Sequence, residues 1–319
     1  MLNSDIRKIP VILDGDPGHD DAIAWVLANA SPILDIRACT SVCGNQTIEK
    51  TTHNAQRIMT LIGLHVPLAM GRARPLVSEP INAPSVHGQS GLDGPTLPEP
   101  TLEPLPINSI ELMAQILEKS EKPITLIATG PLTNVGALLL LYPHLKVKIA
   151  HISLMGGGIA HGNWTPAAEF NILVDPEAAD IVFRSGIPIT MSGLDVTHKA
   201  LVFPEDFERV RAVNNPVARV VAEWLDFFYS FHHSKGYAGA PLHDAVAVLS
   251  LTHPEILTAT ELYIQIEKTG DYCRGMTVAD RFGHTNQPPN ARVNIDIDRK
   301  AFIDLLVESV RYYGKEQHG

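Results

Sequence analysis

Short apolar runs alternate with stretches of helical periodicity along the first two thirds of the chain. Short apolar runs bounded by turn-forming residues are typical of buried strands, and apolar residues that recur every three or four positions are typical of amphipathic helices. These patterns predict strands at residues 10–13, 34–42, 66–69, 124–128, 149–155 and 188–191. They predict helices at residues 20–30, 48–62, 109–119, 132–142 and 175–184. Strands that alternate with helices indicate parallel pairing through right-handed crossovers.

The last third of the chain has a different pattern. Helices are predicted at residues 216–232, 244–251 and 299–313, and partly antiparallel strands at 261–267, 274–278 and 291–298. One long segment rich in Pro and Gly, residues 71–107, carries no strong periodicity, and long loops inside compact domains are usually functional or mobile. We therefore predict the α/β fold class, with a single domain over residues 1–319. Its mostly parallel open sheet would be flanked by helices, with a small antiparallel part near the C-terminus.

Composition narrows the class of protein. The chain has 319 residues, of which 45% are hydrophobic and 19% charged, as in globular proteins with a large core. The net charge of −10 and the lack of any basic run argue against a nucleic-acid partner. The sequence contains no apolar stretch of about 20 residues, so we expect no membrane span. The three cysteines form no Cys-x-x-Cys pair and no signal peptide is evident, so we expect reduced thiols and a cytoplasmic location.

Four aspartates crowd the turn between the first predicted strand and the first helix: Asp14, Asp16, Asp20 and Asp21. In an open α/β sheet this turn lies at the carboxyl end of a strand, where ligands bind. Two unit charges about 6 Å apart repel by roughly 3 kcal/mol at an effective dielectric constant near 20. A divalent cation would compensate this repulsion, and all-oxygen ligands favour Ca²⁺ or Mg²⁺ over Zn²⁺. The alternative is that Asp20 and Asp21 cap the helix while the other two are solvated.

Two further polar groups follow predicted strands. Thr129 comes directly after the strand at 124–128, where it could simply belong to an ordinary strand-to-helix turn. Asn163, Glu169 and Asn171 lie in a loop after three glycines at 156–158. Carboxylate and amide groups suit a hydroxyl-rich ligand such as a sugar, although a polar loop can also be merely solvated.

Histidines supply the remaining candidates. His243 and Asp244 together open a predicted helix and form an acid/base candidate with a possible metal ligand. His87 lies in the long loop, where a lone histidine is usually just exposed. His232 and His233 are interpreted as the end of an amphipathic helix rather than as ligands.

These segments, taken together and in this order, resemble the inosine-uridine-type nucleoside hydrolases. The resemblance covers essentially the whole chain. It rests on residues 14–22, 42–47, 86–91, 129–134, 154–158, 162–171, 193–198 and 243–244. Residues 88–95 and 162–171 look most like the bacterial pyrimidine-preferring ribonucleoside hydrolases. Two positions depart from the family pattern: Gln89 stands where many relatives have Glu, and Ala245 where many have Pro.

The resemblance implies a hydrolase that cleaves the N-glycosidic bond of ribonucleosides to D-ribose and free base. Uridine and cytidine are the substrates it suggests, for pyrimidine salvage, with a homotetramer as the assembly and neither nucleic acid nor membrane as a partner. It implies a Ca²⁺ held by the carboxylates of Asp16, Asp21 and Asp244 and the carbonyl of Thr129. Asp16 would also take a proton from the Ca²⁺-bound water, and His243 and His87 would be catalytic residues near the leaving base.

The substrate-binding residues that the resemblance implies are Asp20, Asn45, Met155, Asn163, Glu169, Phe170 and Asn171. Three alternatives stay open at this point. One is a non-specific hydrolase of purine and pyrimidine nucleosides, and another is a metal-dependent phosphohydrolase with Asp14 as nucleophile and Asp16 as acid. The third is a non-catalytic sugar-binding module, which would give no role to His243 beside Asp244.

Overall fold

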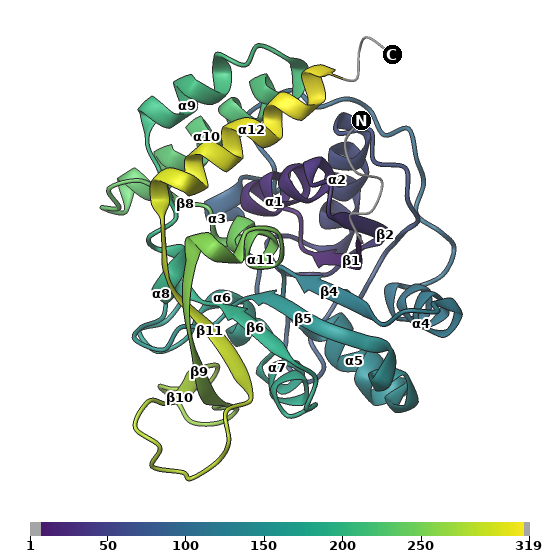
Figure 1. Cartoon of the computed structure of the whole chain (residues 1–319), viewed down its shortest axis with the longest axis vertical. Coiled ribbons are helices and arrows are strands. Elements are labelled where there is room, and N and C mark those ends of the chain that lie inside the picture. Colours follow the sequence, from purple (N-terminus) through teal and green to yellow (C-terminus); the bar gives the residue numbers. More distant parts are fainter. Residues whose placement is uncertain (1–7, 316–319) are drawn as a thin grey trace.

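Nine strands form one sheet in the part of the chain that the computed structural model describes, residues 8–315 (Figure 1). Their order is β10-β9-β11-β6-β5-β4-β1-β2-β3. The bounds are β1 (Ile9–Gly15), β2 (Leu34–Ser41), β3 (Leu68–Ala69), β4 (Ile124–Ala128), β5 (Ile149–Met155), β6 (Ile189–Ser192), β9 (Leu257–Ile266), β10 (Thr277–Asp280) and β11 (Ala291–Ile297). Along the sheet order from β11 to β3, every pair of neighbouring strands is parallel. Strand β9 runs antiparallel to both of its neighbours, β11 and β10. This confirms the predicted single α/β domain.

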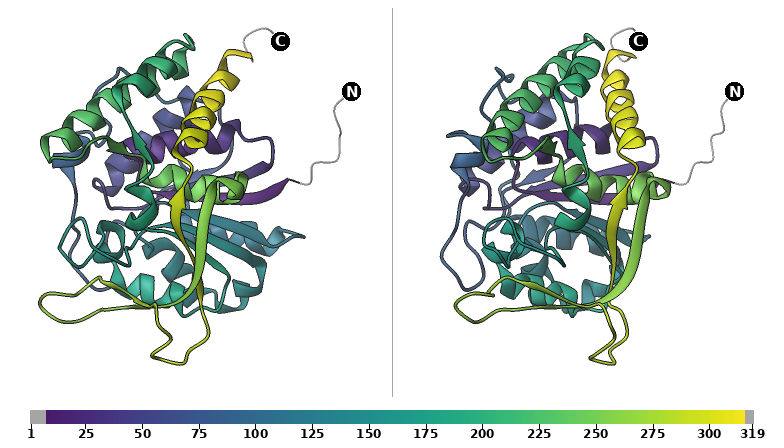
Figure 2. Two further views of the ribbon diagram at one scale, coloured as in Figure 1. Left: turned by 60° about the vertical axis from the view of Figure 1, so that its left-hand side comes forward. Right: turned by 90° about the vertical axis from the view of Figure 1, so that its left-hand side faces the viewer.

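Helices cover both faces of the sheet because its central strands are apolar on both sides. In β1, Val11 and Leu13 belong to one buried core and Ile12, which points the other way, belongs to a second. The first core includes residues of α1 (His19–Ala30), α2 (Ile48–Leu61), α9 (Pro204–Arg211), α10 (Pro216–Ser234), α11 (His243–Thr252) and α12 (Arg299–Lys315). The second includes residues of α4 (Ser109–Lys119), α5 (Thr133–Leu141) and α7 (Pro176–Phe183). Figures 1 and 2 show α10 and α12 together on the first face.

Several elements differ from the sequence prediction. Helix α9 was not predicted, although Pro204 at its first position and the acidic first turn are a recognisable helix start. The strand predicted at 274–278 lies instead at Thr277–Asp280, after a turn in which Gly275 has φ +83°. Residues 71–107 contain only the four-residue helix α3 (Pro84–His87), so the prediction of a long irregular segment is confirmed.

The remaining short elements complete the loops. They are the helices α6 (Phe170–Val174) and α8 (Leu194–Thr197), the 3₁₀ turns η1 (Pro143–Lys148) and η2 (Pro254–Ile256), and a two-stranded ladder of β7 (Leu201–Val202) and β8 (Ala240–Pro241). Among the described residues, no helix combines the length and the apolar character that crossing a membrane requires. Cys39 and Cys43 are buried free thiols, whereas Cys273 is exposed.

Candidate active site

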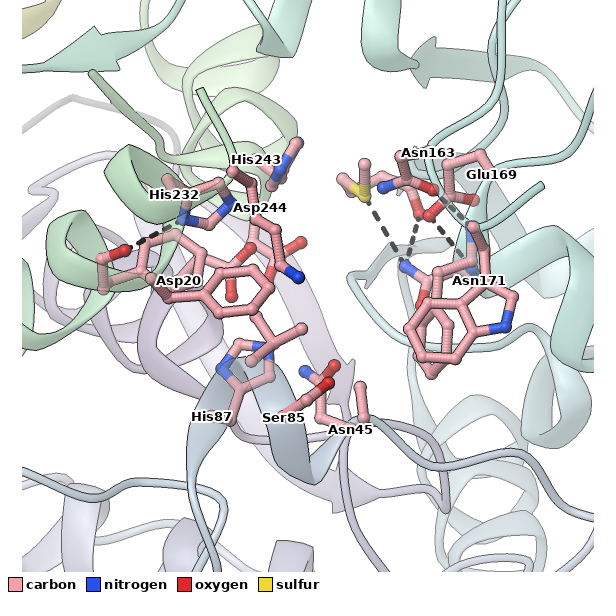
Figure 3. Close-up of a pocket in the computed structure, with 18 of the residues that line it drawn as sticks. Asp20, Asn45, Ser85, His87, Asn163, Glu169, Asn171, His232, His243 and Asp244 are labelled. Carbon is pink, nitrogen blue, oxygen red and sulfur yellow. Dashed lines mark hydrogen bonds between the residues drawn. The ribbon is translucent and has the colours of Figure 1, made fainter. Parts of the chain in front are cut away.

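A pocket of about 370 Å³ opens at the carboxyl ends of the parallel strands. It is where an open α/β sheet places ligands, because the loops after neighbouring strands meet at this edge. All the residues predicted to bind substrate line it, namely Asp20, Asn45, Met155, Asn163, Glu169, Phe170 and Asn171. Thr129, Asp244, His87 and His243 line it as well. Figure 3 shows Asn163, Glu169 and Asn171 on one side, facing His87, His232, His243, Asp20 and Asp244.

Three buried carboxylates form the tightest acidic group among the described residues. Asp20 and Asp21 lie in the first turn of α1, and Asp244 in the first turn of α11. One carboxylate oxygen from each lies within 4.8 Å of the others. Burial, followed by the charge of Asp21, raises the pKa of Asp20 to about 8, and burial with the neighbouring carboxylates raises the pKa of Asp244 well above its ordinary value. Such a group needs a cation or bound protons to remain buried.

Asp16 lies beside this group rather than in it. The prediction placed Asp16 with Asp21 and Asp244 at the metal and gave Asp20 to the sugar, whereas the structure groups Asp20 with the other two. Asp16 Oδ2 accepts the backbone N–H of Asn45 at 2.6 Å. Asp16 Oδ1 and Asp20 Oδ1 are both buried without a hydrogen-bond partner among the described residues. Buried oxygens without partners are costly, so they are positioned for a ligand that the chain itself does not provide.

Glycines let the backbone approach Asp16. A Cβ on Gly44 would lie 2.1 Å from Asp16 Oδ2, and one on Gly130 would lie 2.7 Å from Asp16 Oδ1. Neither distance is tolerated by real side chains, so both positions require glycine while the carboxylate stays in place. The Gly44-Asn45 and Thr129-Gly130 turns therefore enclose the Asp16 carboxylate from two sides.

Two amide side chains have their orientations set by the backbone. Asn171 Nδ2 donates to the carbonyls of Thr129 at 2.8 Å and Met155 at 3.2 Å, which leaves its oxygen to accept from a ligand. Asn163 Oδ1 accepts the N–H of Phe170 at 3.0 Å, which leaves its NH₂ group to donate. The pocket thus offers both an acceptor and a donor on this side.

Glu169 lies on the same side of the pocket as Asn163 and Asn171, and backbone N–H groups hold its carboxylate in place. It caps the N-terminus of α6, and its side chain accepts the N–H groups of Gly157 at 2.9 Å, Asn171 at 2.9 Å and Ile172 at 3.1 Å. Burial raises its pKa to about 7 against the opposing effect of these bonds. A carboxylate held this firmly can bind a hydroxyl group without reorganising.

Histidines and aromatic rings make up the opposite side. His243 Nδ1 lies 2.8 Å from Thr197 Oγ1, and His232 Nδ1 donates to the Phe228 carbonyl at 2.9 Å. Burial lowers the pKa of His232, and it lowers the pKa of His243 well below the ordinary value. His232 does lie in the last turn of α10, as predicted, and in addition it lines the pocket, which the sequence analysis did not predict. Its spacing of four from Phe228 on α10 is the signal that could have placed it there.

The carboxylates of Asp14 and Asp21 accept hydrogen bonds from different groups. Asp14 Oδ1 accepts from Thr40 at 2.6 Å and Asn134 at 2.7 Å, and Asp14 does not line the pocket. Asp21 Oδ1 accepts from Thr129 Oγ1 at 2.7 Å, which ties α1 to the turn after β4. Because Thr40 and Asn134 bind the Asp14 carboxylate between β2 and α5, Asp14 is poorly placed to attack a phosphoester, which disfavours the phosphohydrolase alternative.

Comparison with known proteins agrees with this geometry. Residues 11–304 match the family described as inosine-uridine preferring nucleoside hydrolase. The chain is 54% identical over 308 residues to the pyrimidine-specific ribonucleoside hydrolases RihA of Salmonella typhimurium and Escherichia coli K12, covering 96% of this chain and 99% of each relative.

Solved structures with a similar fold are also nucleoside hydrolases. A purine-preferring ribonucleoside hydrolase from Gardnerella vaginalis has a TM-score of 0.89 at 29% identity, covering 96% of this chain and 99% of its own. The plant nucleoside hydrolase PpNRh1 has a TM-score of 0.87 at 30% identity, covering 95% and 99%. The backbone of this chain is thus shared with a relative that is named purine-preferring.

Proposed function

Because the chain belongs to the inosine-uridine preferring nucleoside hydrolase family and is a ribonucleoside hydrolase, we propose that its substrates are the pyrimidine ribonucleosides uridine and cytidine. The products are D-ribose and the free base. The 54% identity to relatives named pyrimidine-specific over nearly the whole chain carries the base preference. The two-sided pocket supports it, with fixed polar groups for a sugar on one side and aromatic rings with histidines for a base on the other.

The sugar side stabilises the charge that the reaction creates. Cleavage of an N-glycosidic bond builds positive charge on the ribose ring, as in other oxocarbenium-like transition states. Glu169 is a buried carboxylate on this side, Asp20 is a buried carboxylate that faces it across the pocket, and Asn163 and Asn171 complete the contacts to the hydroxyl groups. These groups need little reorganisation during the reaction because the backbone already fixes Glu169 and both amides.

The base side of the pocket stabilises the negative charge on the departing base. The departing pyrimidine becomes negative, and His243 is the proposed hydrogen-bond and proton donor to it. In the imidazolium form that gives up a proton, Nδ1 of His243 donates to Thr197 Oγ1 and Nε2 carries the proton that is transferred, which leaves a neutral ring protonated on Nδ1. Proton donation by a positioned histidine is typically worth roughly 10²–10⁴-fold in rate.

The aspartates fit a divalent cation, and we propose Ca²⁺. Asp16, Asp21 and Asp244 with the Thr129 carbonyl would hold it, and Asp20 is close enough to join them or to bind the sugar. The fit rests on the all-oxygen donor set and on the unpartnered buried oxygens of Asp16 and Asp20. When bound, such a cation orients hydroxyl groups and lowers the pKa of a coordinated water. Asp16, whose burial raises its pKa well above the usual range, is the proposed proton acceptor.

A panel of purified nucleosides tests the base preference. We expect a higher kcat/KM for uridine and cytidine than for inosine, measured by absorbance and by release of reducing sugar. A kcat/KM for inosine equal to that for uridine would favour the second candidate, a non-specific hydrolase. We consider this candidate because a purine-preferring relative has the same fold.

2′-Deoxyuridine tests the sugar side in the same panel. Removing the 2′-hydroxyl leaves buried polar groups unpaired, and sites built for a hydroxyl can reject the deoxy analogue by roughly 10⁴–10⁵-fold. A deoxyribosyl cation forms more easily, which offsets part of this. We expect a loss of at least about 10²-fold in kcat/KM relative to uridine, and equal values would contradict the assignment of the sugar side.

A further inference from the structure

Two hydrogen bonds connect helix α8 to the loop that carries Asn163. Asp195 Oδ2 in α8 accepts the N–H of Ile159 at 2.7 Å. His198 is the C-cap of α8, and its Nδ1 lies 3.0 Å from Nε2 of His161. Neither His161 nor His198 lines the pocket, and the proposed mechanism uses neither side chain.

The loop, residues 158–168, forms a closed turn, which we call the Asn163 turn. The carbonyl of Ala168 closes it by accepting the N–H groups of residues 163–165 at 3.2, 3.2 and 3.3 Å. At its C-terminal end the turn pairs with Met276 through a bridge at Ala168. At its N-terminal end, among the described residues, residues 158–161 make two hydrogen bonds to other segments, and both go to α8 and its C-cap. The position of this end of the turn therefore depends on α8.

The bond between the two imidazoles persists in more than one protonation state. Within residues 8–315, no other hydrogen bond reaches His161 Nε2 or His198 Nδ1. Burial, followed by the charge of His161, lowers the pKa of His198 to about 4. His198 is therefore uncharged at neutral pH, and the pair shares one proton whether His161 is neutral or protonated.

Helix α8 also contacts the base side of the pocket. Thr197 Oγ1 lies 2.8 Å from His243 Nδ1. The ring of His198 packs edge-on against Tyr237, with the centroids 5.4 Å apart and the planes 78° apart, and Tyr237 lines the pocket. Asn163 lies across the pocket from His243 (Figure 3). One helical turn thus links the sugar side of the pocket to the base side.

From this geometry we infer that His161 and His198 are positioning residues, which hold the Asn163 turn against the base side so that the Asn163 amide meets the sugar of a bound nucleoside. The Oδ1 of Asn163 already accepts the N–H of Phe170, so the place of its free NH₂ group is set by the place of the turn. Neither histidine touches the ligand, and both act through Asn163. The inference rests on the proposed function for the identity of the ligand.

Glutamine and leucine at position 161 form a matched pair of substitutions. Glutamine places an amide where the imidazole has Nε2, whereas leucine has no polar atom that could bond His198. His161 is exposed, so neither change disturbs a buried core. The bond between Ile159 and Asp195 remains in both variants, so the turn loses one of its two links to α8 rather than both.

Trp164 reports the position of the turn without any substrate. The chain has three tryptophans, of which Trp25 is 1% exposed and Trp224 0%, whereas Trp164 is 38% exposed. The Trp164 ring packs on Phe170, with the centroids 4.8 Å apart. Acrylamide therefore quenches mainly the fluorescence of Trp164, and Trp164→Phe identifies its contribution. We expect a larger quenching constant in His161→Leu and a parental one in His161→Gln.

Kinetics with uridine test whether the anchor acts through Asn163. We expect His161→Leu to lower kcat/KM by about fivefold, as the loss of one hydrogen bond would, and His161→Gln to recover most of this loss. In an Asn163→Ala background, His161→Leu should cause little further loss, because the contact through which it acts is already absent.

Parental quenching in His161→Leu would overturn the inference. Equal losses of kcat/KM in His161→Leu and His161→Gln would overturn it as well, and so would losses from His161→Leu and Asn163→Ala that simply multiply. The quenching measurement needs no substrate, so its outcome is independent of the proposed function. A protein with the expected quenching that cleaves neither uridine nor cytidine would refute the proposed function and leave the anchoring of the turn in place.

Discussion

At the scale of single residues, the site consists of side chains whose polar atoms are divided between the protein and the pocket. Asn171 uses its nitrogen on two carbonyls and keeps its oxygen for a ligand, and Asn163 does the reverse. Asp16 binds Asn45 through Oδ2, while its Oδ1 has no partner among the described residues. Each of these side chains is thus held rigidly by one atom while the other remains available, which is the arrangement that a preorganised site requires.

Asp16→Asn tests the most exacting of these positions. An amide of the same shape keeps the packing between Gly44 and Gly130, but it cannot accept a proton and is a weaker cation ligand. We expect loss of most of the kcat for uridine in the presence of Ca²⁺, with an unchanged circular dichroism spectrum. Asp35→Asn makes the same chemical change at a half-exposed carboxylate paired with Arg37, so it should leave kcat unchanged. Parental turnover by Asp16→Asn would contradict the proposed roles.

At the scale of elements, the helices position the residues of the base side. The 19-residue helix α10 carries Phe228, Phe231 and His232 to the pocket, and its N-terminus is held far from them. There Asn215 accepts the N–H of Ala218 at 2.8 Å and donates to the carbonyl of Val310 at 2.7 Å. One buried side chain thus both caps α10 and links it to α12.

We therefore expect Asn215→Ala to lower the free energy of unfolding by more than the loss of an ordinary helix cap does. Removing a cap costs about 1 kcal/mol, and losing the buried hydrogen bond to the Val310 carbonyl, which links α10 to α12, adds roughly 0.5–1.5 kcal/mol. The matched control is Asn108→Ala, which removes the cap of the exposed start of α4 without breaking a link to another helix. We expect the larger decrease in the free energy of unfolding for Asn215→Ala in urea titrations. A decrease no greater than that of Asn108→Ala would show that the link to α12 contributes nothing.

At the scale of the whole molecule, the acidic cluster couples ligand binding to stability. Asp20, Asp21 and Asp244 join α1 and α11, two helices that are distant in sequence and pack against each other on one face of the sheet. Their mutual repulsion opposes this packing unless protons or a cation compensate it. A cation that binds only the folded protein therefore stabilises the packing of the whole first face.

Removal of divalent cations should lower the melting temperature. Binding to the folded state alone contributes about 2.7 kcal/mol when the free cation is at 100 times its Kd, which corresponds to a rise of several degrees in a domain of this size. We expect the melting temperature to fall with EDTA and to recover on addition of Ca²⁺, together with the activity. In Asp16→Asn the response to Ca²⁺ should be smaller. A melting temperature that is the same in EDTA and in Ca²⁺ would contradict the proposed cation site.

The sequence by itself determined the features that depend on local patterns and on the order of motifs. Apolar periodicity is a local property, so β4, β5 and α4 lie where it predicts them. Chain order placed the polar turns after strands, and parallel strands end at one edge, so the residues predicted to bind substrate do line one pocket. The same reasoning could have predicted helix α9, because its Pro-Glu-Asp start is a local signal.

Only the tertiary structure decided which groups meet across long stretches of chain. His19 and His87 are 68 residues apart, and Thr129 bonds Asp21 across 108 residues, so the relevant distances depend on crossovers that no local pattern encodes. The same holds for Asp20, which the fold rather than the motif groups with Asp244. The direction of a side chain at the end of a helix depends on what packs against it, so only the structure shows that His232, at the end of α10, lines the pocket.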